Sequence, residues 1–328
     1  MAEQKRIKKA LTKFAGTRKF DILAGTASGI LIILIAVLIS AMAFGAYGLG
    51  LFVLTPIVVG FATGYLVNRR ELLTMKETNR FVLLSAGLGC LALILFALEG
   101  LVCLILAAPL GAVAAIGGGA LGRRLARSAK DSAGPLYCVA LLPVFFAIDA
   151  VYPPAVIMQT DESIVIAAPP SQVWQALISE ESIDQPVTIF GRMGLAYPVR
   201  ARFSGFGVGK TRTGYFSTGA AQERITDWEE NRVLGFRVLS QPPAMKETSP
   251  YGNIHTPHLD GYFETGETRF ELKPVGTGAT KLTVKAAHRL SIDPVIYWQP
   301  IAKWAIGNNT RRVLLDLKNK AERNSHAI

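Results

Sequence analysis

Residues 163–177 read SIVIAAPPSQVWQAL and set the architecture of the C-terminal half of this chain. The Ile-Val-Ile run lies between a pair of acidic residues and a pair of prolines, a pattern typical of a short β-strand that ends in a turn. After the prolines, Val, Trp and Leu recur at the spacing of one helix face. We therefore expect a strand at 163–167, a turn, and a helix at 171–178.

Downstream of this unit, alternating apolar residues and turn residues predict three strand pairs followed by one long amphipathic helix. We expect residues 179–198 to be irregular with one helical turn, and residues 241–259 to form a polar loop. The predicted strands pair as 199–204 with 210–217, 221–228 with 232–239, and 261–273 with 280–290, and the helix runs from 293 to about 322. This order predicts an α+β domain in which a curved antiparallel sheet grips the C-terminal helix.

The opening motif resembles the start of the START-like, or SRPBCC, superfamily, whose members often begin with a strand, an Ala-Pro turn and a helix carrying Val-Trp. The later segments GETRFELKP (266–274) and GTGATKLTV (276–284) are similar to that superfamily's penultimate hairpin. The resemblance covers residues 160–322, and it includes polyketide cyclases/dehydrases, lipid-transport domains and plant allergens. It implies a helix-grip fold with a hydrophobic ligand cavity. It implies no catalytic residue, because the superfamily shares no residue-level catalytic motif.

The N-terminal half has a different composition and resembles no family that we recognise. It contains five apolar runs close to the roughly 20 residues that a membrane-spanning helix needs, at 22–44, 49–67, 81–98, 101–121 and 136–152. The fifth run is short and contains Pro143 and Asp149, so its alternative is an interfacial helix. Proline residues follow it directly. We predict a multi-span membrane domain at 1–152, with a basic N-terminal tail, and a START-like soluble domain at 153–328.

The distribution of charge predicts the orientation of this membrane domain. Lysine and arginine gather in the N-terminal tail and in the connections 68–80 and 122–135, whereas 45–48 and 99–100 contain no basic residue. Basic short loops stay in the cytoplasm. We therefore expect an integral protein of a bacterial inner or plasma membrane, with a cytoplasmic N-terminus. A fifth crossing would place the C-terminal domain outside the cytoplasm.

The net charge of +11 follows from this topology and does not indicate nucleic-acid binding. Residues 1–135 contain 15 Lys/Arg and 6 Asp/Glu, whereas the remaining 193 residues are nearly balanced. The three cysteines all lie in apolar runs, where a thiol acts as a small hydrophobic group. The sequence predicts no cofactor.

Pairs of glycines four residues apart predict close helix packing in the membrane domain. Such faces suit a compact anchor, a bundle with a conduit, or a homo-oligomer of this chain. The pairs are Gly25/Gly29, Gly60/Gly64 and Gly118/Gly122.

Candidate site residues come from the implied cavity and from polar clusters. A cavity would be lined by aromatic and apolar residues of the helices and by inward-facing arginines, which could hold a carboxylate or phosphate group. Packing alone, or a solvent-facing arginine, is the alternative for each. The cavity candidates are Trp174, Arg202, Arg212, Tyr262, Trp298, Ile301 and Trp304.

His255, His258 and Asp260 form a weaker polar candidate in the loop before the last hairpin. A His-x-x-His pair binds a metal when a helical turn aligns it, and Pro257 opposes such a turn. We therefore expect no metal site, and a solvated loop is the alternative to an acid–base role.

Three functions remain open at this point. The favoured one is binding of a lipid or other hydrophobic small molecule at the bilayer surface, without catalysis. The alternatives are a cyclase-, dehydrase- or hydrolase-like enzyme that acts on an apolar substrate, and a membrane sensor or interaction protein.

Overall fold

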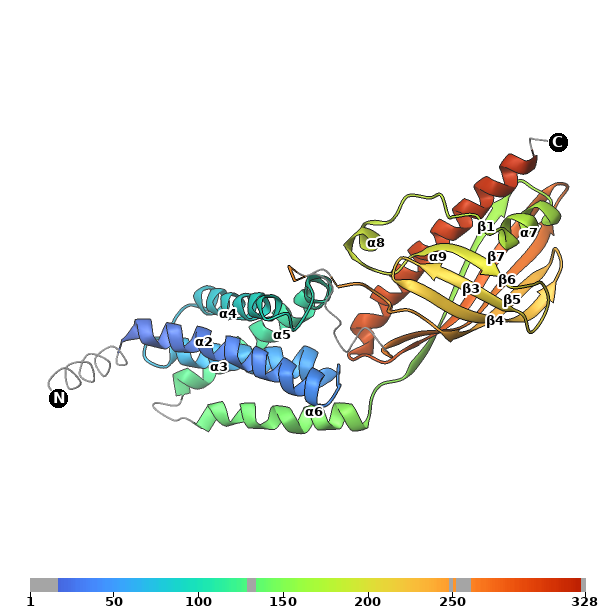
Figure 1. The fold of residues 1–328 in the computed structure, drawn as a ribbon. Helices are drawn as coiled ribbons and strands as arrows, with labels where there is room; N and C mark the ends of the chain where they lie inside the picture. Colours follow the sequence, from blue (N-terminus) through green and yellow to red (C-terminus); the bar gives the residue numbers. More distant parts are fainter. Residues whose placement is uncertain (1–16, 129–133, 248–249, 252–260, 326–328) are drawn as a thin grey trace. The chain divides into compact units, whose positions relative to one another are not determined.

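The computed structural model describes residues 17–128, 134–247, 250–251 and 261–325 (Figure 1). The chain divides into two compact units. One comprises Met1–Pro153 together with Glu247–His258, and the other comprises Pro154–Lys246 together with Leu259–Ile328. The unit boundary near residue 153 lies at the proline pair that follows the last apolar run.

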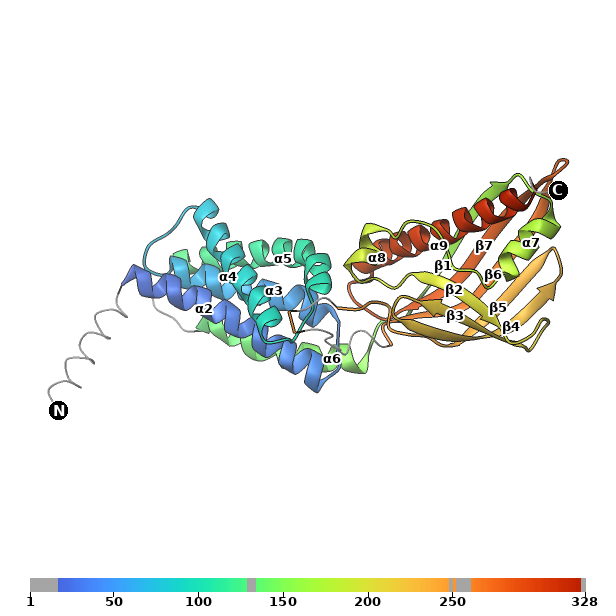
Figure 2. The ribbon, with the colours of Figure 1, turned by 45° about the horizontal axis from the view of Figure 1, so that its top comes forward.

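The first unit is a bundle of apolar helices that run alternately up and down (Figures 1 and 2). Four helical segments are long and apolar enough to cross a membrane: Arg18–Ala43, Gly50–Asn68, Met75–Leu95 and Leu101–Ser128. Their outer surfaces carry exposed leucines such as Leu31, Leu84 and Leu91. A water-soluble bundle would bury such side chains, whereas lipid accommodates them. The elements are α2 (Arg18–Val37), η1 (Leu38–Ala43), η2 (Gly50–Leu54), α3 (Thr55–Asn68), α4 (Met75–Leu95), α5 (Leu101–Ser128), η3 (Gly134–Leu141) and α6 (Leu142–Val151).

The fifth apolar run forms the shorter apolar helix Cys138–Val151. Its side chains Leu142 and Phe146 are buried against Ile32 of α2 and Val59 of α3. Asp149 accepts a hydrogen bond from the backbone N–H of Gly50 at 2.7 Å. The run therefore packs along the bundle helices, as a member of the bundle.

The predicted glycine pairs pack helices of the same chain against one another. A Cβ atom at Gly60 would collide with the Ala115 carbonyl of α5, and one at Gly118 would collide with the Ile57 carbonyl of α3. Gly29 is similarly close to Ser85 of α4. These glycine faces contact other helices of the same chain. They therefore do not offer a free surface for the predicted homo-oligomer.

The second unit is a seven-stranded antiparallel sheet that curves around one long helix (Figure 2). The strand order is β1-β7-β6-β5-β4-β3-β2, so the first and last strands are neighbours and β2 forms the far edge. This is the helix-grip architecture that the sequence predicted. The elements are β1 (Val156–Ile166), α7 (Pro170–Ile178), α8 (Ile189–Met193), β2 (Pro198–Phe203), β3 (Thr211–Phe216), β4 (Gly219–Glu229), β5 (Val233–Ser240), β6 (Phe263–Val275), β7 (Ala279–Leu290) and α9 (Val295–Ser325).

The first strand begins seven residues earlier than the pattern at 163–167 predicts. It pairs with β7 along its whole length, from Val156 opposite Leu290 to Ile166 opposite Thr280. Two of its inward positions, Thr160 and Glu162, are polar, so the apolar alternation is interrupted in the middle of the strand, between the inward Met158 and Ile164. Backbone pairing with β7 stabilises this part as a strand, although the local sequence pattern does not predict it.

The charged side of α9 is also more buried than its amphipathic pattern predicts. Arg312 is 6% exposed, and its guanidinium donates to the carbonyls of Ile183, Gln185 and Pro198. Lys320 likewise donates to the Ser182 carbonyl at 2.8 Å. The irregular segment between α7 and β2 covers this side of the helix, and the buried cations satisfy its backbone carbonyls.

Candidate functional site

The candidate site is the space between α9 and the inner face of the sheet. Alternation along each strand turns every second side chain toward α9. On β7, for example, Leu282, Val284 and His288 are buried while the residues between them are more exposed. These inward positions are the ones that a molecule held in the grip would contact.

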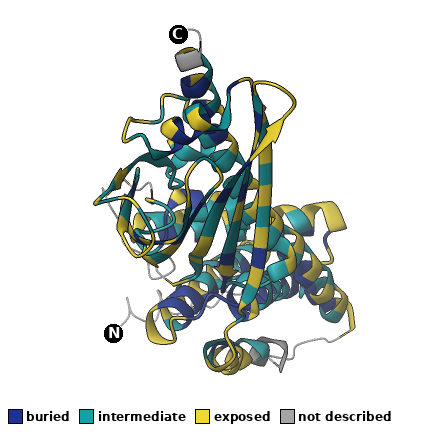
Figure 3. Cartoon of the chain, turned by 90° about the vertical axis from the view of Figure 1, so that its right-hand side faces the viewer, coloured by how far each residue is buried: buried dark blue, intermediate teal, exposed yellow. Residues whose placement is uncertain are grey.

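The inner space has two ends along α9, and the residues of α9 differ in burial between them. Figure 3 colours the chain by the burial of each residue. Six of the ten residues at 312–321 of α9 are buried, against one of the seventeen at 295–311. We call the first stretch, with the core that it contacts, the closed end, and the second stretch, with the strands that face it, the open end. Arg312, Asp316 and Lys320 among the six face the segment that follows α7. Inside the grip, the contrast is between Leu314, Leu317 and Ala321 at the closed end and one buried residue of α9, Trp298, at the open end.

The closed end is a conventional apolar core. Leu314 and Leu317 of α9 pack with Ile166 of β1, Leu282 of β7 and Trp174 of α7. Trp174 is 2% exposed, and its ring meets that of Trp228 edge-on at 5.0 Å. The predicted cavity residue Trp174 therefore lies in the packed core, because the α7 face that carries it is pressed between the sheet and α9.

The open end is packed unevenly. Ile306 of α9 and Thr160 and Glu162 of β1 are half buried, whereas Met158 of β1 and His288 and Leu290 of β7 are buried. The helical repeat places the predicted cavity residue Ile301, and Ala305, on the face of α9 that carries Arg312 and not on the face toward the sheet. β2, whose inward residues face the same space, has no buried residue. An apolar side chain that points between two layers and keeps exposed surface is one that a guest could cover.

Of the other candidates on α9, Trp298 is 9% exposed, and its ring nitrogen donates to the Asp293 carbonyl at 3.1 Å. Trp304 is 52% exposed and meets the Phe190 ring of α8 edge-on at 4.3 Å. Tyr262 is half buried just before β6, and its carbonyl accepts the Ser291 N–H at 2.8 Å. These residues border the open end, where Trp298 forms part of its wall and Trp304 lies nearer to solvent.

The structure separates the two candidate arginines. Arg212 of β3 points inward, whereas Arg202 of β2 points outward, with 56% of its side chain exposed and a 3.6 Å contact to Glu180. The alternation of the strand decides this, because Phe203 pairs with Arg212 and takes the inward position next to Arg202. Arg202 therefore does not line the inner space.

Arg212 forms an ion pair with Glu223, its cross-strand partner on β4. The side chain of Arg212 is 16% exposed and that of Glu223 is 4% exposed. The guanidinium lies over the Phe236 ring, with Cζ 4.3 Å from the ring centroid. Burial raises the pKa of the Glu223 carboxyl group, and the neighbouring guanidinium only partly offsets this.

His288 of β7 is a second polar group of the interior, and the sequence did not single it out. It is 5% exposed, and its two ring nitrogens lie 3.2 Å from the hydroxyls of Thr160 and Thr265. Burial lowers the pKa of His288 to about 4, so the ring is neutral near pH 7. The sequence contains one signal for this residue: His288 occupies the same alternating, inward positions of the strand as Leu282 and Val284. Because the two threonines engage both nitrogens, the ring is a satisfied structural group and is not poised as a general base.

The remaining polar candidates, His255, His258 and Asp260, lie outside the described residues.

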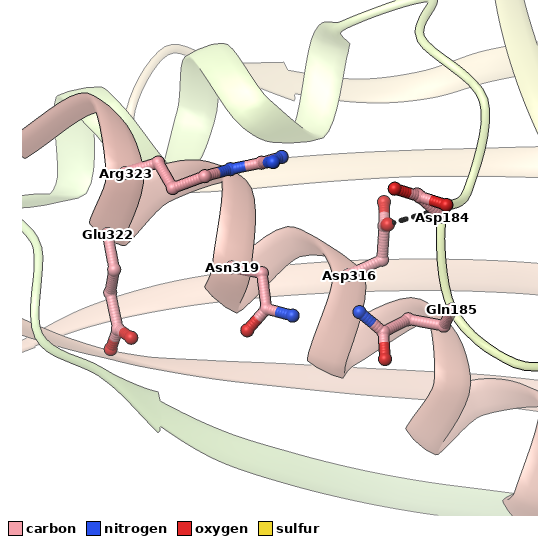
Figure 4. Close-up of a pocket in the computed structure, with 6 residues that line it drawn as sticks. All are labelled: Asp184, Gln185, Asp316, Asn319, Glu322 and Arg323. Carbon is pink, nitrogen blue, oxygen red and sulfur yellow. Dashed lines mark hydrogen bonds between the residues drawn. The ribbon is translucent and has the colours of Figure 1, made fainter.

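A separate cleft of about 360 Å³ lies on the covered side of α9, beside the segment that follows α7 (Figure 4). Its buried member, Asp316, accepts the Asp184 N–H at 2.7 Å and pairs with Lys320 at 2.8 Å. The lining is polar throughout, which does not suit an apolar ligand. It consists of Asp184, Gln185, Asp316, Asn319, Glu322 and Arg323.

No protein-family model matches this chain, and no curated protein matches it. Solved structures similar to it include a protein from Nitrosomonas europaea, at 12% identity over 52% of this chain and 97% of that chain, with a TM-score of 0.35. The Zhui aromatase/cyclase from Streptomyces sp. R1128 is similar at 14% identity, over 52% of this chain and 96% of that one, with a TM-score of 0.34. Norcoclaurine synthase from Thalictrum flavum is similar at 9% identity, over 50% of this chain and 86% of that one, with a TM-score of 0.33.

At these identities the similarity concerns the fold alone. The strand order of the second unit, with one long helix against the sheet, fits the helix-grip fold that the resemblance to the START-like superfamily implies.

Proposed function

We propose that the second unit binds a lipid or another hydrophobic small molecule in the open end of the grip, at the surface of a membrane that the first unit spans. The observation that carries this proposal is the contrast in burial along α9, from a packed closed end to a half-buried open end. Pockets for small molecules are mostly apolar with a few polar groups that orient the guest. On the inner face, Ile306 of α9 supplies apolar surface, and the Arg212–Glu223 pair on the sheet, beside Phe236 of the core, supplies the polar groups.

The membrane part of the proposal rests on the bundle and its charges. The four long apolar helices are joined at one end by segments rich in arginine, and at that end Asp21 pairs with Arg69 and Arg70 at 2.6 Å each. Glu99, at the other end, accepts a hydrogen bond from Tyr47 at 2.9 Å. Basic connections stay in the cytoplasm, which puts the other end outside.

The fifth segment can supply an odd crossing despite its small number of residues. Its first part, Gly134–Leu141, is a 3₁₀-helix, which rises about 2.0 Å per residue instead of about 1.5 Å. Together with α6 it reaches about 31 Å, close to the roughly 30 Å of a hydrocarbon core. We therefore keep the five-span topology, with the second unit on the extracytoplasmic side. A phosphatase fused after Ile328 is then active in intact cells, whereas activity of a cytoplasmic reporter alone at that position contradicts the topology.

Attachment to the bundle has a functional consequence for a lipid-binding unit. The last helix of the bundle ends at Val151 and β1 begins at Val156, so few residues separate the membrane segment from the grip. A short tether keeps the local concentration of a binding unit high, up to the millimolar range. An apolar guest can then pass between bilayer and grip without a long path through water.

The test compares guests in the full chain and in a variant whose open end is filled. The wild-type chain and Ala302→Phe, which enlarges a half-buried side chain in helical phase with Ile306 and Val313, are purified in the same mild detergent, extracted with organic solvent and analysed by mass spectrometry. Because lipid that adheres to the bundle is common to both, the difference reports the inner space. Lys303→Phe, on the exposed side of the same helix turn, is the matched control.

We expect one class of apolar molecule in wild type and in Lys303→Phe, and its loss in Ala302→Phe. Equal recovery from all three proteins would show that the grip holds no guest.

A further inference from the structure

Arg212 is the one cation among the described strand residues that faces the inner space. The other arginines and lysines of the sheet fall on outward positions, as Arg202, Arg237 and Arg269 do. A buried charge costs stability unless it is paired, and replacing such a pair by apolar residues is often neutral or stabilising. The presence of a charged pair in this interior therefore calls for a reason other than packing.

The pairing of Arg212 is incomplete in a specific way. One terminal nitrogen of the guanidinium meets Glu223, whereas the Nε–H group is buried and has no acceptor among the described residues. A buried donor without an acceptor costs about 1–3 kcal/mol, and such groups are rare in native proteins. The cover over this group includes Phe203, a half-buried side chain whose ring centroid lies 5.7 Å from Arg212 Cζ. An incoming guest can displace such a side chain more easily than a packed one.

We infer that Arg212 binds the polar end of the guest, and that the guest is an amphiphile ending in an oxygen acceptor such as a carboxylate, an ester or a ketone. This inference rests on the proposed function, because it names the chemical class of the molecule that the grip would hold. A pure hydrocarbon would leave the Nε–H group without an acceptor. An amine would bring a second positive charge toward the guanidinium.

The charge of the pair is compatible with either a neutral or an anionic acceptor. Glu223 is almost completely buried, and burial favours its protonated form. A carboxylate guest can therefore share one proton with Glu223 while the guanidinium carries the positive charge. An ester or ketone leaves the existing ion pair unchanged and only adds an acceptor.

The experiment uses the full chain in lipid nanodiscs and three photoactivatable probes with the same diazirine-bearing alkyl chain. One probe ends in a carboxylate, one in a methyl ester and one in an amine. After irradiation, peptide mass spectrometry separates label on the second unit, at β3–β5 and α9, from label on the bundle helices. We expect the acid and the ester to label the inner-face peptides about tenfold more than the amine, which corresponds to about one charged hydrogen bond.

Two variants connect this preference to the pair. Arg212→Met combined with Glu223→Met removes both charges without leaving either one unpaired, and we expect it to abolish the preference while an apolar guest still binds. Arg202→Met, on the outer face of the neighbouring strand, is the matched control and should keep the wild-type ratio. Thermal unfolding of all proteins establishes that they fold.

The outcomes separate the two proposals. Equal labelling of the inner face by the three probes, or an unchanged preference in the double variant, overturns the role of Arg212 and leaves the binding function standing. If none of the probes labels the inner-face peptides, the proposed function is wrong and this inference is wrong with it.

Discussion

The two ends of the grip are built from the same helix and the same strands, yet they differ in how completely they are packed. At the closed end, Leu314 and Leu317 have apolar partners on β1, α7 and β7. At the open end, Ile306 points between the same layers and keeps exposed surface. The closed end therefore stabilises the fold, and the open end is where a guest can add the contacts that the chain itself does not make.

The largest expected effect tests this division with two tryptophans. Trp174→Ala removes a 2% exposed ring from the closed end and should lower the free energy of unfolding by about 4 kcal/mol, whereas Trp304→Ala at the open end should cost about 1 kcal/mol or less. Hydrogen exchange of the β7 amides in the full chain measures both. Similar losses in the two variants would remove the distinction between the ends.

The second-largest effect on stability is expected from acidification, through His288. Above pH 6.5 this histidine is neutral in the folded and the unfolded chain, so it has no effect there. As pH falls from 6.5 to about 4, the unfolded chain takes up a proton while the lowered pKa keeps the folded ring neutral. The sheet should lose about 3 kcal/mol over this range.

His288→Gln should show a smaller loss across the same pH window, measured by the same exchange experiment. An equal loss in this variant would mean that other groups cause the acid sensitivity.

Replacing a small side chain by a large one should also distinguish the two ends of the grip. Ala321 is 0% exposed, so Ala321→Phe forces strain into the closed end and should cost about 2 kcal/mol, whereas Ala302→Phe at the open end should cost less than about 1 kcal/mol. Thermal unfolding of the two purified variants makes the comparison. A larger penalty at Ala302 than at Ala321 would show that the open end has no spare room.

The smallest effect is expected on the outer face. Arg202→Gln breaks an exposed contact with Glu180 and should change the free energy of unfolding by about 0.5 kcal/mol or less. Arg212→Gln on the inner face should cost more, because it leaves Glu223 buried without its ion pair. Unfolding by heat ranks the two, and the reverse order would contradict the orientation assigned to these arginines.

The order of elements was predictable from the sequence because it depends on local patterns. Alternation and turn residues predicted strands near those observed, as for 280–290 and β7 (Ala279–Leu290). Runs of apolar residues likewise predicted the four long bundle helices. Both signals act over a few neighbouring residues, so they survive in the one-dimensional chain.

What the sequence could not reveal depends on partners far along the chain. The early start of β1 needs the backbone of β7, and the inward direction of Arg212 needs the register with Phe203 and Glu223. The burial of Trp174 and the exposure of Trp304 follow from which layers meet at each end of α9, and two tryptophans have the same intrinsic preference for burial. Local periodicity determined the elements of this protein. The three-dimensional meeting of distant elements determined which residues line the site, because burial is a property of the space between segments and not of any one segment.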